Sequence, residues 1–108
     1  VAENNKLNGI TVVAKARVKL VKNRANENEM HGLQVREAGT AELERNTFDK
    51  NDKSGIEVRG RGSEIKLKRN RCRRNLEYGV RFVDGAAGFK IGRDNEISKN
   101  RKGRVRMR

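Results

Sequence analysis

Lysine and arginine are the residues of this 108-residue sequence whose number and spacing most clearly suggest a chemical role. There are 27 of them against 14 aspartates and glutamates, which gives a formal net charge of +13. Four recur at a nearly fixed spacing, at Lys22, Arg45, Arg69 and Arg93. Because a column of like charges attracts a ligand that carries many opposite charges, this spacing favours binding of a polyanion.

A repeat positions these residues along the chain. Residues 32–51, GLQVREAGTAELERNTFDKN, contain a glycine, an alternating apolar strand, a turn, a second alternating strand and two asparagines five residues apart. The pattern recurs at steps of 23, 23, 24 and 24 residues, starting near Gly9, Gly32, Gly55, Gly79 and, as a partial copy, Gly103. A period of this length is typical of solenoid proteins.

The apolar residues of the repeat form three columns that we expect to face inward. The first strand contributes Ile10/Val12, Leu33/Val35, Ile56/Val58 and Val80/Phe82, the second contributes Val18/Leu20, Ala41/Leu43, Ile65/Leu67 and Phe89/Ile91, and the third column is Ala25, Phe48, Cys72 and Ile97. We predict an all-β fold, a single-stranded parallel β-helix of about four coils with three short strands per coil. Parallel crossovers favour a right-handed solenoid. We expect residues 1–108 to form one domain, either a whole unit or a fragment of a longer β-helix, and Cys72 to serve as a buried apolar residue.

Two asparagine columns complete the repeat. They are Asn23, Asn46, Asn70 and Asn95, and then Asn28, Asn51, Asn75 and Asn100. Coils stack about 4.8 Å apart, so each column can form a ladder of side-chain amides along the axis. Asparagine also tolerates the left-handed backbone conformation that a sharp corner needs. We therefore predict a structural role for both columns.

The pattern carries a family resemblance. Gly32-Leu33-Gln34-Val35, followed by Leu43, Asn46, Phe48 and Asn51, resembles the right-handed parallel β-helix repeats of three groups: pectate-lyase-like carbohydrate-active proteins, periplasmic copper-maturation proteins and the substrate-side domain of some F-box proteins. The resemblance covers nearly the whole chain and implies the fold. It leaves the function open, because such folds include lyases, hydrolases, epimerases, phage tailspikes and non-catalytic binding modules.

Within a β-helix the four basic residues become a stripe along one edge of the solenoid, with one charge about every 4.8 Å. Outward and turn positions extend the expected polyanion site to Arg36, Arg59, Lys66 and Lys90. The alternative is that these charges only keep an exposed sheet soluble. The run Arg59-Gly60-Arg61-Gly62 fits a glycine turn better than a short RNA-binding element.

Aromatic composition narrows the ligand class. Tyr78 is the only tyrosine, tryptophan is absent, and the three phenylalanines fall in inward columns, so no platform for stacking bases or neutral sugars is expected. We predict a non-catalytic module that binds an acidic polysaccharide, with a nucleic-acid backbone as the other polyanion. The alternatives are a scaffold within a larger protein or ribonucleoprotein assembly and a remnant of a polysaccharide lyase or hydrolase.

We expect no catalysis, cofactor or metal site. The outward column of the first strand is Thr11, Gln34, Glu57 and Arg81, which places no two carboxylates in adjacent coils. His31 fits a corner residue better than a base or a ligand. No apolar run is long enough for a membrane span, so no membrane partner is expected. Unpaired strand edges at the ends of the solenoid favour packing with further coils or end-to-end self-association.

Overall fold

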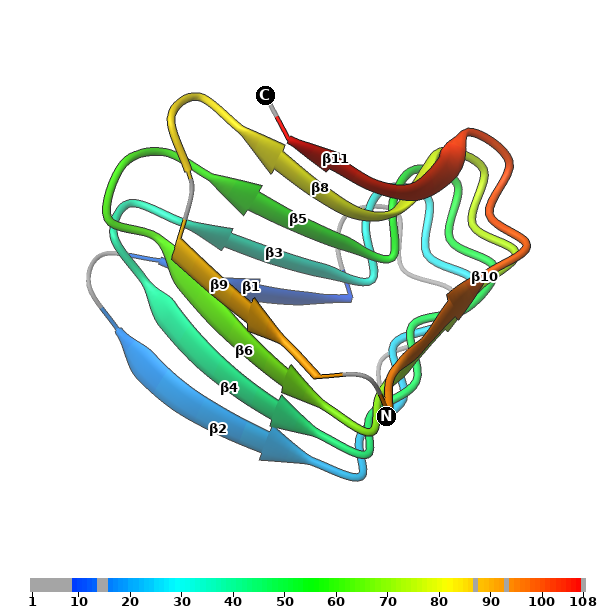
Figure 1. Ribbon diagram of the computed structural model, residues 1–108, viewed down its shortest axis with the longest axis horizontal. Helices are drawn as coiled ribbons and strands as arrows, with labels where there is room; N and C mark the ends of the chain where they lie inside the picture. Colours follow the sequence, from blue (N-terminus) through cyan, green and yellow to red (C-terminus); the bar gives the residue numbers. More distant parts are fainter. Residues whose placement is uncertain (1–8, 14–15, 87, 93, 108) are drawn as a thin grey trace.

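The computed structural model of the chain is an all-β solenoid (Figure 1). It describes residues 9–13, 16–86, 88–92 and 94–107. Within that part of the chain the strands are β1 (Ile10–Val12), β2 (Arg17–Val21), β3 (Leu33–Arg36), β4 (Thr40–Glu44), β5 (Ile56–Arg59), β6 (Glu64–Lys68), β7 (Arg71–Arg73), β8 (Tyr78–Val83), β9 (Gly88–Ile91), β10 (Glu96–Ser98) and β11 (Gly103–Met107).

The strands form three parallel sheets, one for each face of the solenoid. The first sheet has the order β1-β3-β5-β8-β11, the second β2-β4-β6-β9 and the third β10-β7. Each strand pairs with its equivalent in the next coil, as Leu33 does with Ile56 and Ile56 with Val80. The predicted parallel β-helix is confirmed. The third face is the most weakly paired, because Arg24, Thr47 and Arg71 join only through isolated bridges.

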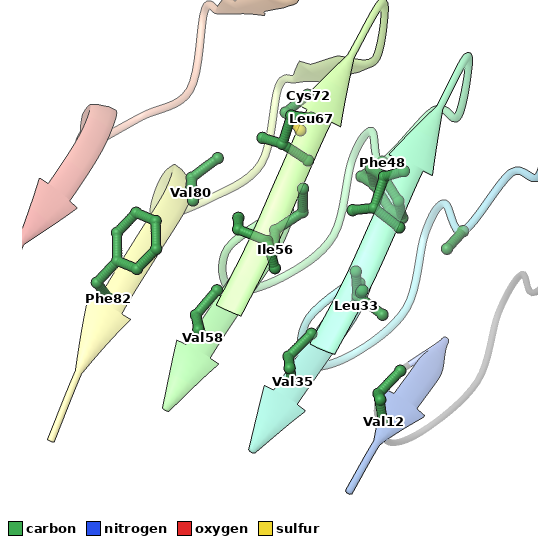
Figure 2. Close-up of a cluster of buried hydrophobic side chains, with 14 of the residues drawn as sticks. Val12, Leu33, Val35, Phe48, Ile56, Val58, Leu67, Cys72, Val80 and Phe82 are labelled. Atoms are coloured by element: carbon green, nitrogen blue, oxygen red, sulfur yellow. The ribbon is translucent and has the colours of Figure 1, made fainter. Parts of the chain in front are cut away.

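The core consists of the predicted inward columns. Figure 2 shows Val12, Val35, Val58 and Phe82 stacked from successive strands of the first sheet. The third column is buried as predicted, at Ala25, Phe48, Cys72 and Ile97. Burial, assisted by the negative charge of Asp49, raises the pKa of the Cys72 thiol well above its usual range, so this cysteine behaves as a small apolar residue. The side chains of Phe89 and Ile91 lie outside the described residues.

The two asparagine columns form hydrogen-bonded ladders. The Asn51 Oδ1 accepts the backbone N–H of Asn28 at 3.0 Å and its Nδ2 group at 3.0 Å. The Asn51 Nδ2 donates to the Ala25 carbonyl at 3.1 Å and to the Asn75 Oδ1 at 3.0 Å. All four side-chain bonding positions are thus used, and they join three successive coils. The first column forms the same links through Asn46, Asn70 and Asn95.

The left-handed residue at each corner is not the asparagine but the residue before it. Lys22, Arg45 and Arg69 precede the first ladder and have φ values of 58° each. Before the second ladder, the φ values are 59° at Glu27, 58° at Lys50, 56° at Arg74 and 58° at Lys99. The asparagine side chain must point into the corner to reach its ladder partners, so the preceding residue makes the reversal. Its own side chain then lies in solvent.

The last coil contains one more residue than the glycine spacing suggests. Asn95 lies 25 residues after Asn70, and its Oδ1 accepts the Asn70 N–H and the Asn70 Nδ2 group, which continues the same ladder. β11 therefore pairs Gly103 with Tyr78 and Val105 with Val80. Gly103 consequently does not match Gly79, the position that the spacing suggested. The register follows the apolar and asparagine columns, which carry the packing and hydrogen bonds, rather than the glycine.

Removal of one ladder amide should weaken the fold strongly. Asn51→Ala loses four hydrogen bonds and leaves the buried Asn28 N–H without an acceptor, so we expect a loss of about 3 kcal/mol in the free energy of unfolding. Urea denaturation monitored by circular dichroism measures it. Asn26→Ala is the graded control, because Asn26 Oδ1 accepts only the Asp49 N–H, at 2.8 Å. Equal losses in the two variants would contradict the role of the ladder.

The left-handed corner can be tested by placing valine and glycine at a corner position and at a strand position. The two positions should prefer opposite residues. Lys50→Val should lower the free energy of unfolding by about 1–2 kcal/mol, because a β-branched residue is strained at positive φ, whereas Lys50→Gly should be tolerated. At the exposed strand position Lys68 the order should reverse, with valine tolerated and glycine destabilising. The same order at both positions would rule out the assigned corner conformation.

Candidate functional site

The third face of the solenoid carries an excess of basic residues. We define it as residues 22–28, 45–51, 69–75 and 94–100, the segments between the two asparagine ladders. These segments contain nine basic and four acidic residues. Two lines of exposed left-handed residues border the face: the first corner column (Lys22, Arg45, Arg69) and the second corner column (Glu27, Lys50, Arg74, Lys99). Five residues of near-extended chain separate the columns by about 15 Å.

The predicted basic stripe is present in part. Lys22, Arg45 and Arg69 are in equivalent positions of successive coils, as expected. Arg93 lies outside the described residues, and Asp94 is the residue directly before Asn95. The extra residue in the last coil places this acid next to the stripe: Asp94 Oδ1 accepts the Arg69 N–H at 3.3 Å, and its Oδ2 lies 3.3 Å from Arg69 Nε. The stripe is therefore present in the first three coils, and the place of Arg93 in it stays a prediction.

The second corner column was not part of the sequence-based prediction. Lys50, Arg74 and Lys99 are exposed and share the same left-handed conformation. None of the three forms an ion pair within the described part of the chain. The repeat itself indicated this column, since the residue before the second asparagine is basic in three of four coils. Both edges of the third face therefore carry basic side chains.

A buried carboxylate organises the centre of the third face. Asp49 Oδ2 accepts the Arg71 Nε at 2.9 Å and lies 2.8 Å from its Nη2, while Asp49 Oδ1 accepts the Arg73 N–H at 2.9 Å. Arg73 also reaches Glu96, with Nη1 at 3.5 Å from Oε2. The Arg71 side chain remains 42% exposed. Its guanidinium is fixed on one side by Asp49, so the opposite side can donate hydrogen bonds outward.

The other predicted basic residues do not join this face. Arg59 contacts Glu57 through Nε at 3.3 Å and Asp84 through Nη1 at 2.8 Å. On the second sheet Lys66 lies 3.7 Å from Glu42, and Lys90 occupies the equivalent place in β9, although its side chain is not described. Arg36 is exposed at the end of β3. The outward column of the second sheet reads Lys19, Glu42, Lys66 and Lys90, so Glu42 interrupts its basic residues.

A buried polar cluster on the outer side of the first sheet was also missed. Glu57 is 1% exposed, and its Oε1 accepts the Gln34 Nε2 at 2.7 Å. The His31 Nε2 lies 3.2 Å from Glu57 Oε2, and His31 Nδ1 accepts the Ser54 N–H at 3.2 Å, which places the proton of the neutral ring on Nε2. His31 is thus a buried corner residue. The sequence feature that could have revealed this cluster is the placement of Gln34 and Glu57 in adjacent coils of one outward column, where their side chains can form a hydrogen bond.

The surroundings of Glu57 keep it ionised. Burial alone would raise the pKa of this carboxyl, but hydrogen bonds from His31, Gln34 and Arg59, with the attraction of His31, outweigh burial and lower the pKa to about 2. Its oxygens already accept three partners. A carboxylate in this state neither donates nor accepts a proton near neutral pH.

Comparison with known families agrees with this geometry. The profile of the family described as "Right handed beta helix region" matches residues 1–106. The chain belongs to this family. The searches of curated proteins and of solved structures gave no significant match to this right-handed β-helix.

Other kinds of site were sought in the described part of this right-handed β-helix. There, no group of three or more histidine, cysteine, aspartate or glutamate side chains is arranged to hold a metal ion. The same residues contain no helix long and apolar enough to cross a bilayer. The third face is therefore the surface on which we base a functional proposal.

The Glu57 cluster should make the stability of this β-helix depend on pH. Because its pKa falls from 4.5 to about 2 on folding, the ionised carboxylate stabilises the fold fully above pH 4.5, and this stabilisation is lost as the pH falls toward 2. Glu57→Gln should cost about 2–3 kcal/mol at pH 7 and remove that part of the pH dependence.

Urea denaturation at neutral pH and at several acidic pH values measures both effects. Glu44→Gln is the control, since Glu44 is half-buried and forms no ion pair among the described residues. An unchanged pH profile in Glu57→Gln would refute the assignment.

Proposed function

We propose that this β-helix is a non-catalytic module that binds a polyanion, an acidic polysaccharide, on its third face. The observation that carries the proposal is a set of exposed basic side chains on the two corner columns that no acid of the described chain pairs: Lys22, Arg45, Lys50, Arg74 and Lys99. Fixed cations at coil spacing attract a ligand with repeated negative charges. The coil spacing, about 4.8 Å, is set by strand pairing.

The chemistry of the third face supports recognition by charge and hydrogen bonding. Its only aromatic residue, Phe48, points into the core and is fully buried. Stacking of bases or of neutral sugar rings therefore has no platform on this face. The Asp49-bound Arg71 adds a planar donor that suits carboxylate or sulfate groups. These features favour an acidic polysaccharide over single-stranded nucleic acid.

The state of the carboxylates supports a binding role rather than catalysis. Glu57 is buried and saturated with hydrogen bonds, and Asp49 is engaged with Arg71 and Arg73. Lyases and hydrolases of polysaccharides need carboxylates that bind cations or exchange protons with the substrate. Neither of these two groups is available for that work.

Binding should depend on the second corner column. The triple variant Lys50→Gln, Arg74→Gln, Lys99→Gln should bind a linear polyuronate about tenfold more weakly at physiological salt. The slope of log affinity against log salt should become shallower by about 2, because three cationic contacts are lost. Isothermal titration calorimetry at several salt concentrations measures both quantities.

The matched control removes the same charge from the second sheet, through Arg17→Gln, Lys19→Gln and Lys68→Gln, and should bind nearly as wild type. Structured RNA and a neutral glycan are the comparison ligands. If RNA binds more tightly than the polyuronate and depends on the same three residues, the third face is the binding surface but the proposed ligand class is wrong. If both triple variants weaken binding equally, the charge acts generically and a scaffold role is the better explanation.

A further inference from the structure

The charges of the third face are distributed unevenly, and their arrangement gives the face a direction. Viewed as a rectangle, the face has four corners, each defined by one corner column and one end of the coil stack. Lys22 and Lys99 occupy two opposite corners. Glu27 occupies the third, and Asp94, paired with Arg69, lies at the fourth, where Arg93 is outside the described residues.

The unpaired cations follow one diagonal of this rectangle. Among the described residues of the first corner column, the free cations are Lys22 and Arg45, since Arg69 is engaged by Asp94. In the second corner column they are Lys50, Arg74 and Lys99, toward the opposite end of the stack. Among the described residues, Glu27 lies at one end of the second corner column and Asp94 beside Arg69 at the other end of the first. A polyanion along either edge therefore meets one of these acids, whereas one that crosses obliquely meets only Asp49 and Glu96, which are paired with Arg71 and Arg73.

The centre of the same diagonal is also basic. Arg71 and Arg73 lie between the two sets of free cations. Asp49 orients the Arg71 side chain, while the Arg73 side chain lies between Asp49 and Glu96, with its Nε 3.9 Å from Asp49 Oδ2. This Nε is buried and has no hydrogen-bond partner in the described part of the chain. The Asp49 side chain is only 7% exposed and its negative charge is offset by Arg71 and Arg73, which lie between it and a ligand on the face.

We propose that a linear polyanion crosses the third face obliquely, from Lys22 and Arg45, over Arg71 and Arg73, to Arg74 and Lys99. This inference rests on the proposed function and specifies the binding path and the length of the ligand. Three coil steps and the width of the face give a diagonal on the order of 20 Å. The ligand is accordingly an extended, unbranched acidic polysaccharide of at least that length.

The path predicts a dependence on chain length that a single stripe would not give. The experiment titrates oligouronates of defined length, from disaccharide to dodecasaccharide, into the full chain. One variant, Lys22→Gln with Arg45→Gln, removes the first end of the path, and another, Arg74→Gln with Lys99→Gln, removes the second. Arg17→Gln with Lys19→Gln on the second sheet is the charge-matched control. Circular dichroism verifies the fold of each variant.

For wild type, affinity should rise with oligomer length and level off once the oligomer spans the diagonal. Each end variant should weaken binding of the long oligomers roughly fivefold to tenfold, and affinity in each should level off at a shorter length. The control should follow wild type. The affinity of a short oligomer should not depend on both ends of the path at once.

The alternatives give distinguishable results. If long oligomers depend on Arg74 and Lys99 but not on Lys22 and Arg45, the ligand follows the second corner column; the oblique path is then wrong while the proposed function survives. If each end variant already weakens the binding of a disaccharide, the face has two separate binding sites, and the single oblique path is wrong. If neither end variant differs from the control, the oblique path and the proposed function both fail.

Discussion

The hydrogen-bonded ladder of asparagine side chains is the interaction on which the rest of this structure depends. A coil with little apolar surface cannot hold a sharp corner by packing alone, because the corner leaves backbone groups without partners. Each interior asparagine supplies an acceptor to the coil before it and donors to the backbone and amide groups around it, as Asn51 and Asn70 show. Two such ladders keep the stacked coils in register.

The ladder also determines what the surface can display. Since the asparagine must turn inward, the residue before it must adopt the left-handed conformation and turn outward. That conformation costs about 1–2 kcal/mol for a residue with a side chain. The ladder offsets this cost in every coil, and Lys50, Arg74 and Lys99 occupy the resulting exposed positions. The basic edges of the third face are thus a consequence of how the corners are made.

Sequence reasoning recovered the features that repeat and missed those that break the repeat. The apolar columns and asparagine ladders were predictable, because side-chain period and spacing report burial directly. The extra residue before Asn95 was not apparent, since the glycine spacing looked regular, although Asn95 itself shows the longer step. The prediction therefore overlooked Asp94, which lies between Arg93 and Asn95 in the sequence and pairs with Arg69. Register depends on hydrogen bonds between coils, which glycine spacing does not report.

The polar cluster on the first sheet was missed for a different reason. An outward glutamate in a β-helix is expected to be solvated, and the burial of Glu57 follows from side chains of two coils, including His31 and Gln34, that close over it. Such cooperation between coils is not visible in any one repeat. The ion pairs that occupy Arg59 and Lys66, and so separate them from the free cations, are missed for the same reason.

The left-handed corner positions also determine how the sequence of such a chain can vary. Their side chains touch neither the core nor the ladder, so a substitution there alters the surface of one coil and leaves the others intact. Glu27 and Lys50 occupy equivalent places in neighbouring coils with opposite charges and nearly the same backbone angle. Sequence variation at the corner positions can therefore change the charge of the surface one coil at a time without altering the fold.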